Sequence, residues 1–321
     1  MLVITDLGAW DVDPLASLVE ARRVKLGLTP AEDEAVVLLR ELFPRARSLN
    51  TAAMAADRAP AGWLALAVAA KADASQYDAL MAVARRPAAL PGPIAAIALA
   101  GCNFHGNRGR PWSAPRGNLH LSCCLPVDLD LARSAAALPA TAAVAVCDAL
   151  AQCAPDLEPR LKWVNDVLLA CAKVAGVLAA AQTRGSRVLA LTFGIGVNVA
   201  VAPEVAPTVF VPRVTCLHAH AAGRQVTVGG LTLALLAALG ARVVQLAREG
   251  PDPVIAAYRQ SCGDIGRRVG VWAEGLPDAA DLAQLPPPLA TGRVLALAGD
   301  LALVVDGAPE PLRNGRLAYL D

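Results

Sequence analysis

One stretch of the chain combines glycine and arginine in a way that suits binding of a phosphate. Residues 101–122 read GCNFHGNRGRPWSAPRGNLHLS. Glycines allow backbone N–H groups to approach an anion closely, and guanidinium groups supply charged, forked donors. The residues that could form such an anion cradle are Gly101, Gly106, Gly109 and Gly117, with Arg108, Arg110 and Arg116. A solvated, flexible loop is the alternative that composition alone leaves open.

A second group of polar residues lies in the otherwise apolar stretch 161–182. Lys162, Asn165 and Asp166 surround Trp163, and Lys173 follows eleven residues after Lys162. The apolar runs 167–169 and 174–181, joined by a short link, predict a β-hairpin. Its charges would lie at the ends and the turn. Single charged residues in such places are usually ordinary surface residues, but this cluster is larger than a single lysine.

A third stretch, residues 187–200, reads RVLALTFGIGVNVA and predicts a strand. Gly194 and Gly196 alternate with apolar residues, so one face of that strand lacks side chains. Such a face permits close approach of a flat ligand such as a purine ring. A bulge or crowded core packing is the alternative.

Together these stretches resemble the biotin protein ligases. Lys-Trp-x-Asn-Asp followed by Lys-x-Ala-Gly is similar to that family's KWPND and KLAG elements, with Val164 in place of proline. Residues 106–122 are similar to its glycine and arginine loop and the next strand, and residues 194–199 match its G-I-G-x-N-V element. The three elements occur in the family's order, and the resemblance runs from about residue 60 to the C-terminus.

The resemblance implies an ATP-dependent biotin–[biotin carboxyl carrier protein] ligase. Such an enzyme forms biotinyl-AMP with ATP and Mg²⁺ and transfers biotin to a lysine of a biotin carboxyl carrier protein or a similar acceptor domain. It implies catalytic roles for Lys173, Arg110, Arg108 and Asp166. It implies a biotin site at Ser75, Gly106, Gly109, Trp112, Gly117, Lys173 and Gly176. Asn165, Gly194, Gly196 and Asn198 would serve ATP, and Asn165 with Asp166 would hold the metal.

The chain departs from the family pattern around the expected biotin pocket. Phe104, His105 and Asn107 stand where the family has Gly, Arg and Arg, and a glutamine that usually precedes the loop is absent. Only Ser75 remains of a Ser-Thr-Asn element, where it equally suits the N-cap of a helix. We therefore expect weaker biotin binding and a leakier adenylate. Two alternatives stay open: a ligase for lipoate or octanoate, and a binding protein that has lost catalysis.

The expected fold class is α+β, with a mixed sheet and flanking helices followed by a small SH3-like β-barrel. We expect an N-terminal helical segment at 1–60, a catalytic domain at 61–262 and the C-terminal domain at 263–321. Periodicity predicts helices at 13–25, 31–42, 78–86, 135–151, 229–246 and 254–259, with Asp148 facing solvent. Strands are expected at 63–73, 94–100, 265–272, 292–298, 301–305 and 316–320.

Composition limits the other function classes. Of 321 residues 55% are hydrophobic and 18% charged, so a large core is expected, and the net charge of +1 gives no electrostatic reason to bind nucleic acid or membranes. No helix-turn-helix pattern is apparent near the N-terminus, so DNA is not expected as a partner. The eight cysteines lack metal-ligand spacing, and acidic residues stand where a signal peptide needs positive charge, which together favour the cytoplasm. A homodimer is left open.

Overall fold

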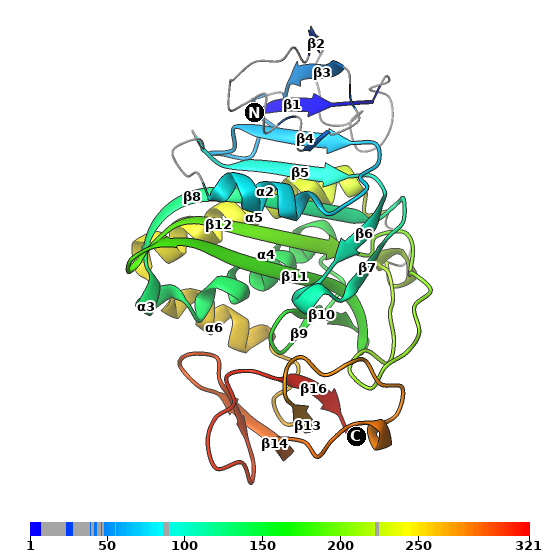
Figure 1. Ribbon diagram of the computed structural model, residues 1–321, viewed down its shortest axis with the longest axis vertical. Coiled ribbons are helices and arrows are strands. Elements are labelled where there is room, and N and C mark those ends of the chain that lie inside the picture. The colour runs from blue at the N-terminus through cyan, green and yellow to red at the C-terminus, as the bar shows by residue number, and fades with distance from the viewer. Residues whose placement is uncertain are drawn as a thin grey trace.

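The computed structural model describes residues 1–7, 24–27, 39, 42–43, 46, 48–54, 56–85, 90, 92–221 and 225–321 (Figure 1). Its strands are β1 (Leu2–Thr5), β2 (Val24–Gly27), β3 (Ser48–Ala53), β4 (Ala65–Ala69), β5 (Ile94–Ala98), β6 (Gly101–His105), β7 (Pro111–Ala114), β8 (Leu119–Asp130), β9 (Arg160–Lys162), β10 (Asp166–Leu169), β11 (Ala172–Arg184), β12 (Arg187–Val197), β13 (Arg268–Trp272), β14 (Ala290–Leu297), β15 (Leu303–Val305) and β16 (Arg316–Tyr319). Its α-helices are α2 (Gln76–Ala84), α3 (Leu131–Ser134), α4 (Ala137–Cys153), α5 (Val228–Glu249) and α6 (Asp252–Ser261), and its 3₁₀ turns are η3 (Asn107–Gly109), η4 (Leu217–Ala219) and η5 (Leu282–Gln284).

The main sheet is mixed, as the sequence predicts. Its order in the described part of the chain is β2-β3-β1-β4-β5-β8-β12-β11-β10-β9. The pairs β1–β4 and β4–β5 are parallel, whereas β5–β8, β8–β12, β12–β11, β11–β10 and β10–β9 are antiparallel. The predicted hairpin at 161–182 is therefore confirmed as β10 and β11. Its turn consists of Ala170 and Cys171, both with positive φ angles of 47° and 62°.

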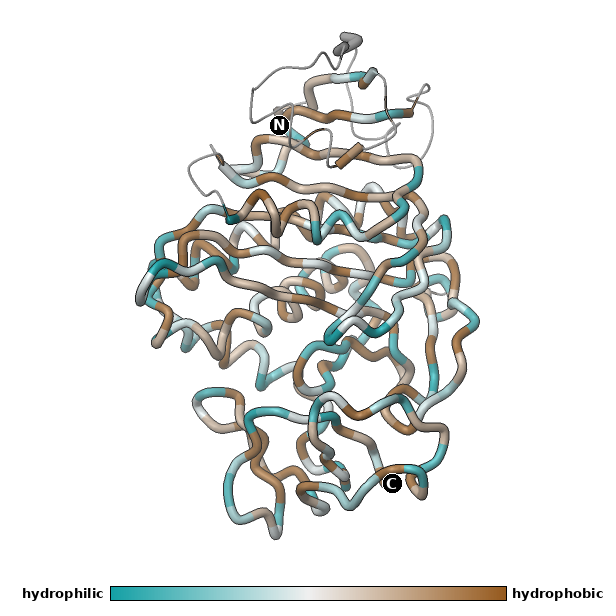
Figure 2. Tube along the Cα trace, in the orientation of Figure 1, coloured by the Kyte–Doolittle hydropathy of each residue, from teal (hydrophilic) through white to brown (hydrophobic). Residues whose placement is uncertain are grey.

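The two faces of this sheet are covered differently. Helices α4, α5 and α6 lie behind it in Figure 1, and α2 lies in front. Successive strand residues point to opposite faces, so the adjacent cysteines of β8 separate: Cys123 packs in the cluster that includes α4 and α5, and Cys124 packs with Leu80 of α2. Figure 2 shows hydrophobic residues along both the central strands and the helices behind them. The helix expected at 135–151 is confirmed as the largely buried α4.

Helix α5 confirms the prediction at 229–246 and provides a partner for Asp148, whose side chain faces solvent as predicted and is 37% exposed. Asp148 on α4 is not freely solvated, since Arg242 of α5 donates two hydrogen bonds to it, from Nε at 2.7 Å and from Nη2 at 3.0 Å. The pair fixes the two helices together where they cross. Within the described residues, α5 alone is long and apolar enough to cross a membrane. Its buried face packs in the main core, as a core helix does.

The C-terminal strands form a separate four-stranded antiparallel sheet, β15-β14-β13-β16. It lies beyond β9 and α6 in Figure 1 and corresponds to the predicted small β-barrel. Its core is continuous with that of the main sheet, because Val269, Val271 and Leu317 belong to the same buried cluster as Trp163 and Leu161. That residues 263–321 form a domain that folds independently therefore stays a prediction.

The N-terminal segment differs from the expected helical one where the structure describes it. Strands β1 and β3 pair with each other, and β1 continues the main sheet beside β4. The predicted helix at 13–25 lies outside the described residues except at its end, where residues 24–25 belong to β2. Most of the predicted helix at 31–42 also lies outside them. Short strands with apolar and polar residues mixed carry a weak local signal, which explains the difference.

The expected glycine and arginine loop is a second difference. Residues 101–114 form a two-stranded hairpin, β6–β7, with only its tip irregular. Phe104 and Trp112 are cross-strand partners, and both pack on Ala72, Ala98 and Ala114. Burial of these aromatic rings stabilises the hairpin. The arginines at its tip are thereby held over the sheet at a defined position.

Candidate active site

The β10–β11 hairpin brings the predicted lysine and carboxylate into contact. Lys173 Nζ lies 2.6 Å from Asp166 Oδ1, and each side chain is less than one fifth exposed. A register shift between Val167 and Leu168 makes this approach possible, because Asp166 is paired with Gly176 and Leu168 with Lys173. Lys173 Nζ also lies 5.7 Å from the centre of the Trp112 ring. The pair is thus fixed from two sides, by a carboxylate and by an aromatic face.

Backbone contacts anchor the residues around this pair. The Lys173 N–H donates to Arg213 O at 2.9 Å, and the Thr215 N–H donates to Lys173 O at 2.9 Å. The Asn165 side chain donates from Nδ2 to Val177 O at 3.1 Å, which leaves its carbonyl oxygen as an acceptor. Trp163 precedes Val164 across a cis peptide bond. Asn165 in the turn between β9 and β10 and Asp166 at the start of β10 line the same cavity.

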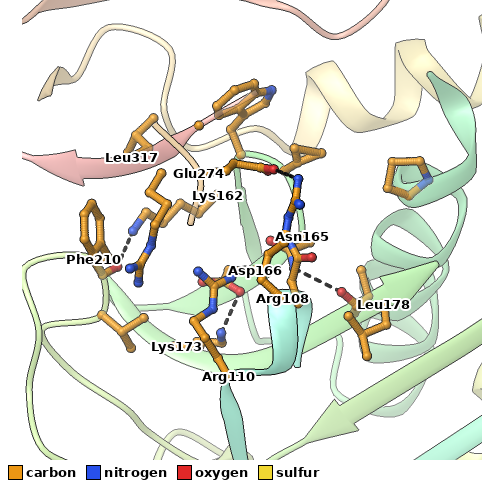
Figure 3. Close-up of a pocket in the computed structure, with 18 of the residues that line it drawn as sticks. Arg108, Arg110, Lys162, Asn165, Asp166, Lys173, Leu178, Phe210, Glu274 and Leu317 are labelled. Carbon is orange, nitrogen blue, oxygen red and sulfur yellow. Dashed lines mark hydrogen bonds and ion pairs between the residues drawn. The ribbon is translucent and has the colours of Figure 1, made fainter. Parts of the chain in front are cut away.

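The β6–β7 hairpin contributes the arginines. Arg110 lies half-buried, and burial, followed by repulsion from Arg316, lowers the pKa of its guanidinium. Arg108 is more exposed and forms an ion pair with Glu274 (Figure 3). Glu274 belongs to the C-terminal unit, residues 263–321, which contains β13 to β16. It has a positive φ of 58° and lies in the 3₁₀ turn at the hairpin tip. The two predicted arginines therefore separate: Arg110 lies in the site, and Arg108 joins the tip to Glu274.

A cavity of about 520 Å³ lies between the main sheet, the hairpin tip and the C-terminal unit. Several cations line it, namely Arg108, Arg110, Lys162, Lys173, Arg313 and Arg316. Lys162 is 5% exposed and donates from Nζ to Phe210 O. Burial lowers the pKa of Lys162 to about 8. Arg316 of β16 is paired with Asp278. Four carboxylates also line it, Asp166, Glu274, Asp278 and Asp300, and each pairs with one of these cations. The described lining still has more cations than carboxylates, and this excess of positive charge suits a polyphosphate.

A smaller cavity of about 90 Å³ adjoins the first one. Gly194, Gly196 and Gly176 line it, together with Ser75 and Trp112. The glycines make room for aromatic rings: a Cβ at Gly196 would lie 2.3 Å from the Trp112 indole, and one at Gly194 would lie 3.1 Å from the Tyr77 ring. The face expected to receive a flat ligand directly is therefore covered by Tyr77 and Trp112.

Most of the predicted site residues line one of these two cavities. Those that do are Ser75, Gly106, Arg108, Arg110, Trp112, Asn165, Asp166, Lys173, Gly176, Gly194, Gly196 and Asn198. Gly109 and Gly117 line neither; with φ angles of 72° and 95° they occupy turn positions that favour glycine.

Two of the predicted contacts have structural partners of their own. Ser75 caps α2, since its hydroxyl accepts from the Tyr77 N–H at 3.3 Å while the residue also lines the small cavity. Asn198 is 1% exposed and donates to Thr215 O at 3.0 Å. Its side chain therefore holds the loop before η4 against the end of β12. Both residues shape the site through the backbone that they fix.

Several residues of the site are absent from the sequence-based prediction. The sequence motif includes Lys162 but predicts no role for it, and Glu274, Asp278, Arg313 and Arg316 come from the C-terminal strands and turns. His120 and Ser122 of β8 line the small cavity. Their positions opposite Gly196 and Gly194 in the register carry the signal that could have identified them, because paired strand residues share a face.

Comparisons with known proteins find a matching family and several relatives. Residues 95–198 match the model of the Biotin/lipoate A/B protein ligase family. The chain is 32% identical over 232 residues to a biotin–[acetyl-CoA-carboxylase] ligase of Mycobacterium tuberculosis, a match that covers 70% of this chain and 81% of that protein. It is 44% identical over 100 residues to the Paracoccus denitrificans enzyme of the same name, covering 31% of this chain but only 41% of that relative.

The fold is also that of a solved protein. The biotin protein ligase from Aquifex aeolicus, solved in complex with biotin and ATP, aligns with a TM-score of 0.59 at 20% identity, over 79% of this chain and 97% of that one. A biotin protein ligase-like protein of unknown function from Silicibacter aligns with a TM-score of 0.52 at 15% identity, over 77% and 93% of the two chains. At these identities the likeness shows the fold alone.

Proposed function

This chain belongs to the biotin protein ligase family, and from that premise we propose that it activates biotin with ATP and transfers the biotinyl group to a lysine of a carrier domain. One observation supports this most directly. The two cavities share a wall that contains Arg110, Asn165, Asp166 and Lys173. An acid in the small cavity and a nucleotide in the large one would therefore meet at this wall, beside Arg110 and Lys173.

The first step needs stabilisation of negative charge at the shared wall. A carboxylate oxygen of biotin forms a bond to the α-phosphorus, and the bond from that phosphorus to the pyrophosphate oxygen breaks. Lys173 and half-buried Arg110 line both cavities, which supports a role for them as donors to the acid and the α-phosphate. Fixed donors aimed at developing charge in a dry site lower the barrier most. We assign these two residues to the adenylation step.

The second step is attack by an amine of the carrier. Its nitrogen forms a bond to the acyl carbon, the bond to the AMP oxygen breaks, and the nitrogen loses a proton. Asp166 supplies the carboxylate in the shared wall, so we propose that it orients the incoming lysine and accepts that proton. The hairpin tip, with Arg108 held by Glu274, would limit access of water to the anhydride.

The family also implies Mg²⁺, and the donors present fit it. Asp166 offers a carboxylate and Asn165 a carbonyl oxygen at the cavity wall. Protein Mg²⁺ sites commonly consist of one or two such groups completed by substrate phosphates and water. We propose that Asn165 and Asp166 hold the ion, which would neutralise phosphate charge when bound. Until then Lys173 balances the Asp166 carboxylate.

Calorimetry and a turnover assay test the function together. We expect biotin to bind, ATP to tighten its binding, and pyrophosphate to appear only when both are present. An acceptor domain bearing the target lysine should then gain one biotinyl group, detected by mass spectrometry. The altered Phe104, His105 and Asn107 predict weaker biotin binding than in a relative with the full loop. Turnover with lipoate or octanoate but not biotin would move the protein to that alternative.

The buried Lys162 gives a pH prediction. Its pKa of about 8 means that Lys162 is about half protonated at pH 8 in the free protein. Bound polyphosphate favours the charged form and raises this pKa, so ATP binding at pH 8 should take up protons, up to about half a proton per site. At pH 6.5 the lysine is already charged and the uptake should vanish. Calorimetry in two buffers of different ionisation enthalpy measures it.

Lys162→Met is the control for this experiment. The methionine side chain keeps an apolar stem but cannot titrate. The ATP-binding enthalpy of this variant should therefore be the same in both buffers at pH 8. If the variant takes up as many protons as the wild type, another group is responsible and the placement of phosphate beside Lys162 is wrong.

We also propose a reducing compartment, the cytoplasm, as the place of action. All eight cysteines are free thiols, and burial raises the pKa values of the thiols of Cys124 and Cys147 to about 11 and about 12. Buried, protonated thiols behave as small apolar side chains. Two partner statements stay predictions: that the acceptor is a biotin carrier domain, and that DNA is not a partner. A homodimer stays open.

A further inference from the structure

Two buried polar atoms beside the small cavity have no partner among the described residues, namely His120 Nδ1 and Trp112 Nε1. Both residues line that cavity. Buried polar groups are nearly always hydrogen-bonded, because an unpaired one loses its bonds to water without replacement. The cavity therefore has one indole N–H and one imidazole nitrogen available to a ligand.

The position of His120 follows from the strand register. His120 of β8 is paired with Gly196 of β12, and Ser122 with Gly194. Paired residues share a face of the sheet, so the imidazole lies on the glycine face, the one that the Trp112 and Tyr77 rings cover. It is 4% exposed and meets the Phe104 ring edge-on, with the ring centres 5.8 Å apart. The side chain is thus held in place before any ligand arrives.

The other ring nitrogen fixes the tautomer of His120. Nε2 lies 3.1 Å from Pro115 O, and a carbonyl oxygen can only accept, so Nε2 carries the hydrogen. Burial lowers the pKa of the imidazole, which keeps the ring neutral. A neutral imidazole protonated at Nε2 has a lone pair on Nδ1. His120 Nδ1 is therefore an acceptor, and a ligand must supply a donor to satisfy it.

We propose that His120 determines which acid this enzyme accepts, by accepting a hydrogen bond at Nδ1 from an N–H group in the head of the acid. Trp112 Nε1 supplies the complementary donor for a carbonyl oxygen. A cyclic urea offers both groups next to each other, whereas a dithiolane ring or an alkyl chain offers neither. The inference rests on the proposed function and names the element that selects biotin over lipoate or octanoate at that site.

Selection of this kind is strong because the penalty falls on the wrong acid. An acid without the N–H would leave His120 Nδ1 buried and unpaired, and sites built around hydrogen bonds reject analogues that lack them far better than apolar pockets reject a missing methylene. The loss of one such bond corresponds to roughly ten- to a hundredfold in affinity.

Two substitutions separate this role from a purely structural one. In His120→Asn the amide oxygen stands in the place of Nδ1, so the acceptor remains while the donor to Pro115 O is lost. In His120→Gln the terminal amide reaches the place of Nε2, so the Pro115 contact remains while the Nδ1 acceptor is lost. A structural role predicts that Asn is the more damaging change, and the proposed role predicts that Gln is.

Calorimetry with biotin and with its two ureido-N-methyl derivatives tests the proposal, with thermal unfolding as the check on folding. The wild type should bind biotin roughly ten- to a hundredfold more tightly than one of the methylated acids. His120→Asn should retain that preference and His120→Gln should lose it by weakening biotin alone. Equal binding of biotin by wild type and His120→Gln would overturn the role of His120 and leave the proposed function intact. Tighter wild-type binding of octanoate than of biotin would overturn both.

Discussion

Replacing Lys173 by alanine should lower the rate of biotin-dependent pyrophosphate release by on the order of 10² or more, the scale for losing one fixed electrostatic donor. Lys173 lies in the wall that the two cavities share, 2.6 Å from Asp166 and under one fifth exposed. Its charge counts most when the α-phosphate carries the additional negative charge of the transition state.

The way in which kcat and KM change in Lys173→Ala should show whether Lys173 acts in the transition state. A contact made mainly in the transition state lowers kcat and kcat/KM together, whereas uniform binding changes KM alone. We therefore expect the apparent affinity for ATP to change much less than the rate. Lys173→Arg retains the charge but not the compact ammonium beside Asp166, and it should fall between alanine and wild type.

Lys71 provides a matched control for this experiment. It is exposed and lines neither cavity, so Lys71→Ala removes the same charge from the chain without touching the site. Its pyrophosphate release should equal that of the wild type. If Lys173→Ala releases pyrophosphate at a rate close to the wild-type rate, the assignment of Lys173 to adenylation is wrong.

The parts of this site that were predictable are those encoded within a short stretch of chain. Two apolar runs with a short link predict the β10–β11 hairpin, and a hairpin returns Lys173 to the neighbourhood of Asp166. The register shift that brings the two side chains into contact is visible only in the structure. The same holds for the apolar helix α4 and for the four C-terminal strands. In each case the local pattern and the tertiary environment favour the same structure.

The residues that the sequence did not predict are those whose environment is set by distant segments. Lys162 and Arg316 are more than 150 positions apart, yet both line the large cavity. No local pattern indicates that Lys162 is buried or that its pKa is lowered. His120 resembles any strand residue until the register places it opposite Gly196.

The prediction made from the glycines of β12 is partly confirmed by the structure. Their alternation correctly predicts a strand with one face free of large side chains, and it favours a flat ligand against that face. In the structure the rings of Trp112 and Tyr77 cover that face. Trp112 comes from β7 and Tyr77 from α2, so the sequence of β12 alone carries no information about them. Only the fold shows that these two rings lie against the glycine face.

Removal of the C-terminal unit should also have a large effect on adenylation. We expect a chain that ends after Gly263 to adenylate biotin more slowly by at least on the order of 10². The residues removed include Glu274 and Arg316, which line the large cavity, and Glu274 is the partner of Arg108 at the hairpin tip. The truncated chain would keep Lys173 and Arg110 but lose the wall opposite them.

The structure shows a second reason for the loss. Asp264, 0% exposed, accepts from the Trp163 N–H at 2.7 Å and from the Tyr319 hydroxyl at 2.6 Å. The Trp163 indole donates to Leu301 O at 2.8 Å. Truncation would leave both Trp163 donors without these partners, at about 1–3 kcal/mol for each one that stays buried. The turn that presents Asn165 and Asp166 would lose its support, and the melting temperature should fall.

Two point variants separate the cavity wall from the support of the turn. Asp264→Asn keeps every residue of the wall but turns an amide N–H₂ toward one of two buried donors, so it should lower both the melting temperature and the adenylation rate. Glu274→Gln removes the ion pair with Arg108 and leaves the core unchanged, so its melting temperature should stay near that of the wild type while the adenylate leaks to water faster. Circular dichroism, thermal unfolding and pyrophosphate release measured on the three proteins distinguish these effects. A truncated chain that transfers biotin to its acceptor as fast as the full chain would show that the C-terminal unit has no part in the reaction.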